Sequence, residues 1–582
     1  MKQWPGYTEG RKGEVGGKRS PLPRFTVPSQ KSRSIEKWAG EWIRDSVNGM
    51  KSMCYIAAMA DYLLGLNDRQ REAAMHTEGP LLIIAGAGAG KTKTITHRIA
   101  RLMADGMHPR QILALTFTNK AADEMRDRVR LLLAQSNMQG GGAPLIATFH
   151  SLGVRLLREF HEEAGLPRAF SIWDRDDSLR AIKRAHEKLS IDKTPRSSLG
   201  AISNKKGSGI SQRDFASEAT SFRDQTIAQV WELYEKSLQE EDALDFDDLL
   251  ARSLLLLQTN ERVRSLLQSR WRHITIDEYQ DTNAIQYEMA RILGGTERNI
   301  CVVGDTDQCI YTWRQARLEN LLEFETDYPG TKVVLLEQNY RSTRTILTAA
   351  NAVIEKNRRR KPKNLYTDRG IGEPITLYEA AHEVDEAYFI AQKARELMEA
   401  GTKPGEIAVL YRENFQSRVL EEAMLRSDVP YRVLGTRFFQ RKEVKDVLSY
   451  LRAARNGKAR GDMSRAASVP PRGIGEKTVE KMLEGEDAEL APAARKKVAA
   501  FRDALAKIKH AIDILPTSEA VAVAIQLSGM EALYKDTDEG RERLGNMMEL
   551  VNFAVKYDSE QPPAGIERLL EEAALQSDQD QL

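Results

Sequence analysis

The stretch from Pro80 to Thr92 constrains the fold more than any other part of the chain. The apolar run from Leu81 to Ile84 predicts a buried strand, and a helix is expected from Lys93 to about Met103. Alternating glycine and alanine connect the two, and such small residues let successive backbone N–H groups curl around an anion. The stretch therefore predicts a phosphate-binding loop in an α/β fold with a parallel sheet.

Each part of this loop has an expected role. The backbone is expected to surround phosphate along six residues: Ala85, Gly86, Ala87, Gly88, Ala89 and Gly90. Lys91 can reach the β- and γ-phosphates of a nucleotide, and the Thr92 hydroxyl can ligate Mg²⁺. The pattern usually opens with glycine and here opens with Ala85, a mild departure because two further glycines remain. A loop without function is the alternative, which the Lys-Thr pair and the strand–helix context disfavour.

Composition narrows the class of protein. The 582 residues suffice for several domains, and 41% hydrophobic with 29% charged residues describes a soluble globular protein. With a net charge of +2, any nucleic-acid site must be a local patch. Cys54, Cys301 and Cys309 show no metal-ligand spacing and no disulfide framework, which favours a reducing, cytoplasmic setting. No apolar run approaches the roughly 20 residues of a membrane helix, and no signal peptide is evident.

Polar and aromatic residues follow two further predicted strands. Ile112–Leu115 leads into Phe117, Asn119 and Lys120, and a third strand leads to Phe149 and His150. In an open α/β sheet the carboxyl ends of the strands form the ligand-binding edge. An aromatic ring there can stack on a base, and a lysine can meet a phosphate. Ordinary core packing is the alternative for each phenylalanine, and for either one alone it is preferred.

Two adjacent acids and a glutamine follow later strands. Asp277, after the strand that begins near Ile274, is placed to hold Mg²⁺, and Glu278 can polarise the water that attacks a γ-phosphate. A solvated charge pair is the alternative, which the preceding phosphate loop disfavours. Gln308, after another strand, is positioned to sense the γ-phosphate. The next aromatic and basic cluster suits base stacking and backbone contact, and it consists of Tyr311, Trp313 and Arg314.

Three less specific features remain open. The Gln70 amide, in a helix capped by Asn67 or Asp68, can pair with N6 and N7 of adenine, although most surface glutamines contact no base. Arg341, past another buried strand, is either a structural ion pair or an arginine finger at the γ-phosphate. The basic run 358–363 either meets DNA or is simply solvated.

The chain is expected to divide into five parts. Residues 1–62 are a basic extension, rich in Gly, Pro, Ser, Lys and Arg, which is either an arm that touches nucleic acid or, as favoured, disordered or non-native. Residues 63–150 and 271–336 form the α/β domain, and residues 151–270 form a helical insertion within it. Residues 337–435, with a strand at Ile407–Arg412, begin the second half of the chain, which a family resemblance assigns to a second α/β domain. Residues 436–582 are helical.

Taken in order, these blocks resemble the UvrD/Rep/PcrA group of superfamily 1 DNA helicases, from about Leu66 to the C-terminus. The matching blocks are LNxxQ at Leu66–Gln70, the phosphate loop at Ala85–Thr92, TFTNKAA at Thr116–Ala122, TFH at Thr148–His150, DExxQD at Asp277–Asp281, GDxDQxIYxWRxA at Gly304–Ala316 and QNYRS at Gln338–Ser342. The resemblance implies two RecA-like domains with two helical insertions, and ATP-driven 3′→5′ movement on single-stranded DNA.

The resemblance also assigns roles and partners. It implies that Gln70 contacts adenine, that Gln308 couples nucleotide state to DNA, and that Arg341 touches the γ-phosphate. Tyr311 and Trp313 are implied to face bases, and the TFTNKAA and TFH blocks to line the single-strand track. The implied cofactors are ATP and Mg²⁺. The implied partners are single-stranded DNA, duplex junctions and proteins of repair or replication, with no membrane.

The chain departs from the family in two places. Thr306, Cys309, Thr312 and Gln315 replace residues that are usually Asp, Ser, Gly and Gly, and the last two side chains are expected to crowd the DNA track. The family's LHxAKGLEF and YVxxTRA blocks (motifs V and VI), with a second arginine finger, do not occur here. The second RecA-like domain is therefore expected to be incomplete, with an exposed sheet edge.

Three functions follow for comparison. The first is an ATP-dependent DNA helicase, incomplete as given. The second is a protein that binds ATP and DNA without translocating, which the missing blocks favour. The third, a phosphoryl-transfer enzyme on a small substrate, is disfavoured by the aromatic residues at the strand ends.

Overall fold

The computed structural model describes residues 63–135, 142–192, 194–312, 315–412, 416–433, 438–535 and 538–579. The predicted extension at residues 1–62 and the candidate DNA contacts Trp313 and Arg314 lie outside these residues.

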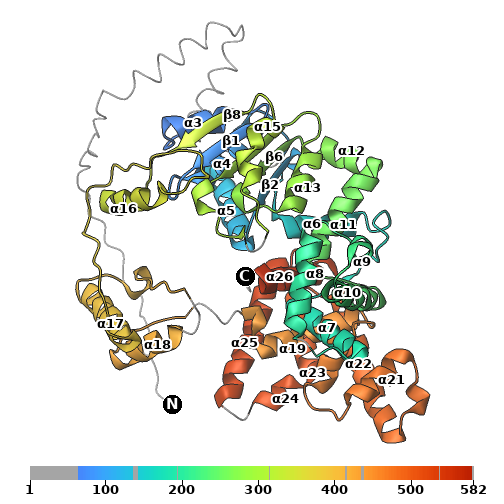
Figure 1. Ribbon diagram of the computed structural model, residues 1–582. Coiled ribbons are helices and arrows are strands. Elements are labelled where there is room, and N and C mark those ends of the chain that lie inside the picture. The colour runs from blue at the N-terminus through green and yellow to red at the C-terminus, as the bar shows by residue number, and fades with distance from the viewer. Residues whose placement is uncertain are drawn as a thin grey trace, which may run out of the picture. The chain divides into compact units, whose positions relative to one another are not determined.

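A parallel sheet of six strands is the centre of the first domain (Figure 1). The strands are β1 (Leu81–Ala85), β2 (Ile112–Thr116), β3 (Leu145–Thr148), β6 (His273–Ile276), β7 (Ile300–Gly304) and β8 (Lys332–Leu336). They lie in the order β3-β2-β6-β7-β1-β8, and every pairing is parallel. The strands predicted from short apolar runs in this domain are confirmed. Because all strands run the same way, the phosphate loop after β1 and the acids after β6 reach the same edge.

Successive residues of the strands pack into different hydrophobic clusters. Leu81 and Ile83 of β1 belong to a cluster with Ile95 of α4, whereas Leu82 and Ile84 belong to a second cluster. Since side chains alternate along a strand, the two clusters cover the two faces of the sheet. Helices that contribute to the first cluster are α3 (Asp68–Met75), α4 (Lys91–Ala104) and α5 (Asn119–Gln135). Helices that contribute to the second are α6 (Phe149–Glu159), α11 (Phe246–Thr259), α12 (Glu261–Arg270), α13 (Ala284–Gly294), α14 (Glu319–Leu322) and α15 (Phe324–Asp327).

The insertion between β3 and β6 is mostly helical, as predicted. Its helices include α7 (Arg175–Leu189), α8 (Pro195–Gly207), α9 (Gln212–Glu218) and α10 (Phe222–Glu240), which share a core around Trp231 and Tyr234. The sequence did not predict the short parallel pair of β4 (Ser171–Ile172) and β5 (Ala243–Leu244).

The region after β8 lacks the predicted second sheet within its described residues. It contains α16 (Arg344–Ile354), α17 (Glu383–Glu399) and α18 (Ser417–Arg426), and the last two share a small apolar cluster. The prediction of a strand at Ile407–Arg412 is wrong. These residues follow a short 3-10 turn at Pro404–Glu406 and pair with no strand. Leu377 and Leu410 are 94% and 93% exposed. Without neighbouring strands, a β-like apolar pattern has nothing to pack against.

The C-terminal part is helical, as predicted. Its helices are α19 (Lys442–Arg455), α20 (Arg460–Ser468), α21 (Glu476–Glu484), α22 (Pro492–Ile514), α23 (Thr517–Ser528), α24 (Met530–Tyr534), α25 (Asp538–Ala554) and α26 (Ala564–Gln579). They share one hydrophobic core, in which α19 is buried along most of its length. Among the described helices, none is both long enough and apolar enough to cross a membrane.

The start of β6 should make this domain sensitive to acid. His273 is 4% exposed, and burial with the nearby charges of Arg98 and Arg272 lowers its pKa from 6.5 to about 4. The unfolded chain therefore binds more protons between those values, so this contribution to stability is lost as pH falls through that range. Replacing His273 by Gln should flatten the pH dependence of urea unfolding by on the order of 1–3 kcal/mol. The exposed His510 of α22, changed to Gln, is the control, and an equal flattening in that variant would contradict the role given to the burial of His273.

Candidate nucleotide-binding site

The phosphate loop owes its shape to two glycines. Gly88 and Gly90 have φ of 68° and 81°, in the left-handed region, where a Cβ atom is strained. Gly90 is also the N-cap of α4, and the Thr94 N–H donates to its carbonyl oxygen over 3.0 Å. The helix thus begins directly after the loop, so the unpaired N–H groups of its first turn face the position where phosphate is expected.

Lys91, the first residue of α4, contacts the acids after β6. Its Nζ lies 2.5 Å from Oε2 of Glu278, and the two side chains are 12% and 32% exposed. Glu278 has φ of 50°, a strained value for a residue with a Cβ atom. Its N–H donates to Oδ1 of Asp277 over 3.0 Å, which helps to hold this turn. The structure therefore brings together the lysine and the acid pair that the sequence placed at one site.

Asp277 is suited to a divalent cation. It is 6% exposed, and burial together with the charge of Glu278 raises its pKa to about 7. A buried carboxylate of this kind favours a positive partner, and carboxylate and hydroxyl oxygens are the ligands that Mg²⁺ prefers. Asp277 and Thr92, the second residue of α4, could therefore hold Mg²⁺, and this role stays a prediction.

Gln70 has a structural use that the sequence did not indicate. It is 1% exposed, its Nε2 donates to the Ala89 carbonyl oxygen over 2.9 Å, and its Oε1 accepts from the Asn67 N–H over 3.1 Å. A Cβ atom on Gly90 would lie 2.6 Å from Nε2 of Gln70. The amide thus supports the loop from α3, and the predicted helix cap at Asn67 is confirmed. An adenine base would compete with these two hydrogen bonds.

The segment after β8 lies over the phosphate loop. The Asn339 side chain donates to the Ala87 carbonyl oxygen over 2.6 Å, and the Tyr340 N–H donates to that of Gly88 over 3.0 Å. Arg341 follows; its side chain is exposed, and a Cβ atom on Gly88 would lie 2.8 Å from its Cβ. The backbone of Arg341 is therefore next to the loop, and its two predicted roles stay predictions. Asn339 is a contact that the sequence did not single out.

Gln308 lies at the end of β7, between β1 and β6. Its Nε2 donates to Oδ2 of Asp305 over 2.6 Å. The Asp305 N–H donates to Oε1 of Gln280 over 2.9 Å, and Nε2 of Gln280 donates to Oε2 of Glu278 over 3.0 Å. Gln308 is thus linked to the acid pair through Gln280, a residue to which the sequence gave no role of its own.

The candidate DNA contacts differ in their burial and in their neighbours. Phe117 stacks on Tyr311, with ring centroids 5.1 Å apart and an angle of 25° between the rings. Phe149 is 4% exposed and belongs to the hydrophobic core, which agrees with core packing, the alternative to a base contact. His150 packs on Phe246.

The remaining described candidates lie at the same strand ends. Asn119 begins α5, and the Ser151 hydroxyl donates to its Oδ1 over 3.5 Å. The neighbouring Lys120 is exposed, and a phosphate could therefore approach its ammonium group. Gln315 has φ of 67° and lies against α8, where a Cβ on Gly207 would come 2.5 Å from its Oε1. The Gln315 side chain thus packs on the helical insertion, and the crowding of the DNA track by Thr312 and Gln315 stays a prediction.

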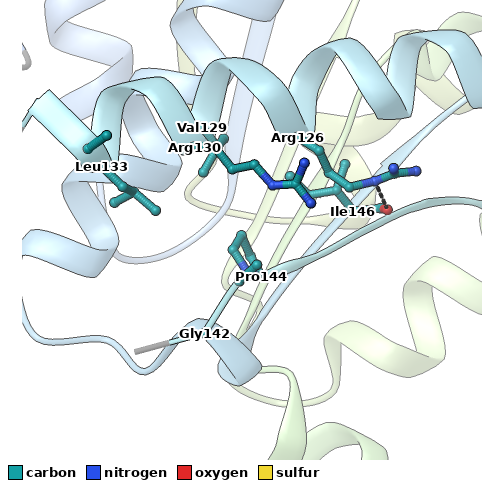
Figure 2. A pocket seen from close by; sticks show the side chains of 9 residues that line it. Arg126, Val129, Arg130, Leu133, Gly142, Pro144 and Ile146 are labelled. Atoms are coloured by element: carbon teal, nitrogen blue, oxygen red, sulfur yellow. Dashed lines mark hydrogen bonds between the residues drawn. The ribbon is translucent and has the colours of Figure 1, made fainter. Parts of the chain in front are cut away.

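A separate cavity of about 270 Å³ lies between α5 and the start of β3 (Figure 2). Arg126, Leu133 and Ile146 are among its lining residues, and Arg126 donates to the Ile146 carbonyl oxygen. None of the predicted site residues lines it. The strand-end arrangement around Lys91 therefore remains the candidate nucleotide site, and this cavity is distinct from it.

The fold and this arrangement define a P-loop nucleotide-binding protein with a parallel sheet. Comparison with known proteins is more specific. Residues 66–329 match the family model described as the UvrD/REP helicase N-terminal domain, and residues 334–582 match that of the UvrD-like helicase C-terminal domain. The chain belongs to the UvrD/REP helicase family, and it is an enzyme of that class.

Curated relatives agree. The chain is 40% identical over 519 residues to a protein named ATP-dependent DNA helicase PcrA from Staphylococcus epidermidis, covering 85% of this chain and 71% of the relative. It is also 40% identical over 521 residues to proteins of the same name from Staphylococcus aureus, covering 85% of this chain and 70% of the relative. The family resemblance inferred from the sequence blocks is thereby confirmed.

Gly88 offers a test of the loop geometry. A Cβ atom there would lie 2.7 Å from Nδ2 of Asn339 and 2.8 Å from Cβ of Arg341, in addition to the strain of a positive φ. Changing Gly88 to Ala should therefore lower nucleotide affinity by on the order of tenfold or more, because the loop or its cover must move. Gly79, with φ of 76° and nothing within 4 Å of an added Cβ, is the matched control. Titration with a fluorescent ATP analogue measures both; equal losses would contradict the steric argument.

Proposed function

We propose that this enzyme binds ATP with Mg²⁺ at Lys91 and uses its hydrolysis to move 3′→5′ along single-stranded DNA and unwind duplex at junctions. The contact of Lys91 with Glu278 is the observation that carries the proposal, because it joins the phosphate loop to the acid pair across 187 residues of chain. The names of the relatives, ATP-dependent DNA helicases, support the choice of nucleotide and DNA. Work in repair or replication and a cytoplasmic location are part of the same proposal.

In this mechanism each residue has one task. Loop N–H groups and Lys91 bind the phosphates. Thr92 and Asp277 would hold Mg²⁺, which would neutralise charge on the phosphate oxygens. Binding of phosphate by Lys91 releases the Glu278 carboxylate, which then orients and polarises the attacking water. Arg341 stabilises the negative charge that develops on the γ-phosphate.

DNA is proposed to cross the same sheet edge beside the nucleotide. The stacked rings of Phe117 and Tyr311 offer a face to bases, and Lys120 can meet the backbone. Gln308, three residues before Tyr311, would couple the two ligands.

A second candidate is a protein that binds ATP and DNA without translocating. The absence of a second sheet from the described part of residues 337–435 favours it, since a translocating motor needs two domains that close on the nucleotide. The two candidates agree on the site and differ in whether hydrolysis moves DNA.

Substitution of the loop lysine tests the site. Changing Lys91 to Ala should lower ATP turnover by about 10²–10³-fold, because the phosphates lose their principal cation. Lys93, two residues further along α4, donates to the Gly65 carbonyl oxygen and is the matched control. Changing Glu278 to Gln should abolish turnover while nucleotide still binds. Phosphate release with and without single-stranded DNA measures turnover; if Lys91 and Lys93 variants behave alike, the site is misassigned.

Strand displacement separates the two candidates. Duplexes with a 3′ or a 5′ single-stranded tail are incubated with enzyme, ATP and Mg²⁺, and the released strand is measured. Translocation in the 3′→5′ direction predicts release from the 3′-tailed duplex only. Binding of both DNA and nucleotide without release of either strand would favour the second candidate, and release from the 5′-tailed duplex would contradict the direction.

A further inference from the structure

The basic run 358–363 is docked on acids at the end of β7. Lys363 pairs with Oδ1 of Asp305, and its Nζ lies 2.5 Å from Oδ2 of Asp307. The side chains of Lys363, Asp305 and Asp307 are 2%, 3% and 9% exposed. Arg360 adds a contact of 2.8 Å to Oδ2 of Asp307. A lysine this buried is tolerated only when it is paired, so its position is well specified.

Asp305 connects this cluster to the nucleotide site. One carboxylate oxygen binds Lys363, the other accepts from Gln308, and the backbone N–H donates to Gln280. Gln280 donates in turn to the Glu278 oxygen that Lys91 contacts. A continuous series of polar contacts therefore runs from Lys363 to the lysine of the phosphate loop.

The residues after Lys363 also contact the segment that covers the loop. The N–H of Asn364 donates to Oε1 of Glu337 over 2.8 Å, and the Asn339 N–H donates to the Tyr366 carbonyl oxygen over 2.7 Å. Leu365 lies so close to Gly86 that a Cβ atom on this glycine would collide with it. Residues 363–366 thus contact the end of β7, the phosphate loop and the segment at residues 337–339 that leads over the loop.

We propose that Lys363 is a positioning residue that couples occupancy of the phosphate loop to Gln308. The inference rests on the proposed function, in that it takes ATP to be the ligand at Lys91. When a phosphate group replaces Glu278 as the partner of Lys91, the hydrogen bonds of Gln280 with Glu278 and with the Asp305 N–H change. Lys363 joins Asp305 to residues 364–366, which contact the segment that covers the loop. The end of β7 and the covering segment therefore respond together.

Hydrogen exchange of the full chain without nucleotide tests the physical connection. Changing Lys363 to Met should speed exchange in peptides that contain residues 305–308 by on the order of tenfold, because two buried carboxylates lose their shared cation. Lys363→Arg, which keeps the charge, should lie closer to the parent chain. Lys361→Met is the matched control, since Lys361 pairs with Glu325 in a contact whose side chains are 20% and 46% exposed. Equal exchange in the Lys363→Met and Lys361→Met variants would overturn the proposal.

A second arm adds ATP with Mg²⁺. In the parent chain, protection should appear at residues 86–92 and extend to 305–308, whereas in Lys363→Met it should remain at 86–92. Protection of 305–308 to the same degree in both chains would overturn the coupling. No protection at 86–92 in the parent chain would instead refute ATP binding at the loop, and thus the proposed function, while the nucleotide-free comparison still decides on the connection.

Turnover gives a readout that loss of structure alone would not produce. Lys363→Met should reduce the stimulation of ATP hydrolysis by single-stranded DNA by on the order of tenfold, with KM for ATP changed less than about threefold. Where Lys363→Met lowers the melting temperature of the whole chain, Lys363→Arg, which keeps the charge at Asp305, should restore both the stability and the DNA stimulation. Unchanged DNA stimulation in Lys363→Met would contradict the proposal.

Discussion

The contact between Lys91 and Glu278 depends on the order of the strands. Because β7 lies between β1 and β6, the lysine at the start of α4 must reach across the end of β7 to meet the acid. A partly buried lysine is costly without a counter-charge, and Glu278 supplies that counter-charge. A phosphate group would compete for that lysine and free the carboxylate. In the proposed mechanism, binding of nucleotide at Lys91 and release of the Glu278 carboxylate would then be the same event. The strained φ of Glu278 fits a turn that is shaped for function.

Much of the first domain could be predicted because its information is local. The strand at Leu81–Ile84 and the one near Ile300 are short apolar runs that stop at polar residues, and both are fully buried in the sheet. The loop glycines needed no tertiary information, since a positive φ at Gly88 and Gly90 is a property of the backbone itself. The same local reasoning was wrong at Ile407–Arg412. An apolar run becomes a strand only where a neighbour pairs with it, and pairing is not visible in the run.

The parts of the site that the sequence did not reveal are long-range contacts. The position of Gln70 near the start of a helix fits either a helix cap or a contact to adenine. Only the fold shows that its amide donates to the Ala89 carbonyl oxygen of the loop. Lys363 stands in a basic run that favoured DNA or solvent equally, yet it is buried against Asp305, 58 residues earlier. The sequence shows that Lys363 is charged but does not show which acid pairs with it, because Asp305 lies on a distant element.

The stacked pair of Phe117 and Tyr311 sets a condition for DNA binding. The rings come from the segments that follow β2 and β7, and their centroids are 5.1 Å apart, which is contact distance for two aromatic rings. A base can therefore stack on an outer face of the pair, but it can enter between the rings only if they separate. Separation would move the stretch that links Gln308 to Tyr311, and Gln308 is tied through Asp305 to the acids at the nucleotide. Entry of a base and the state of the nucleotide would then act on the same few residues at the end of β7.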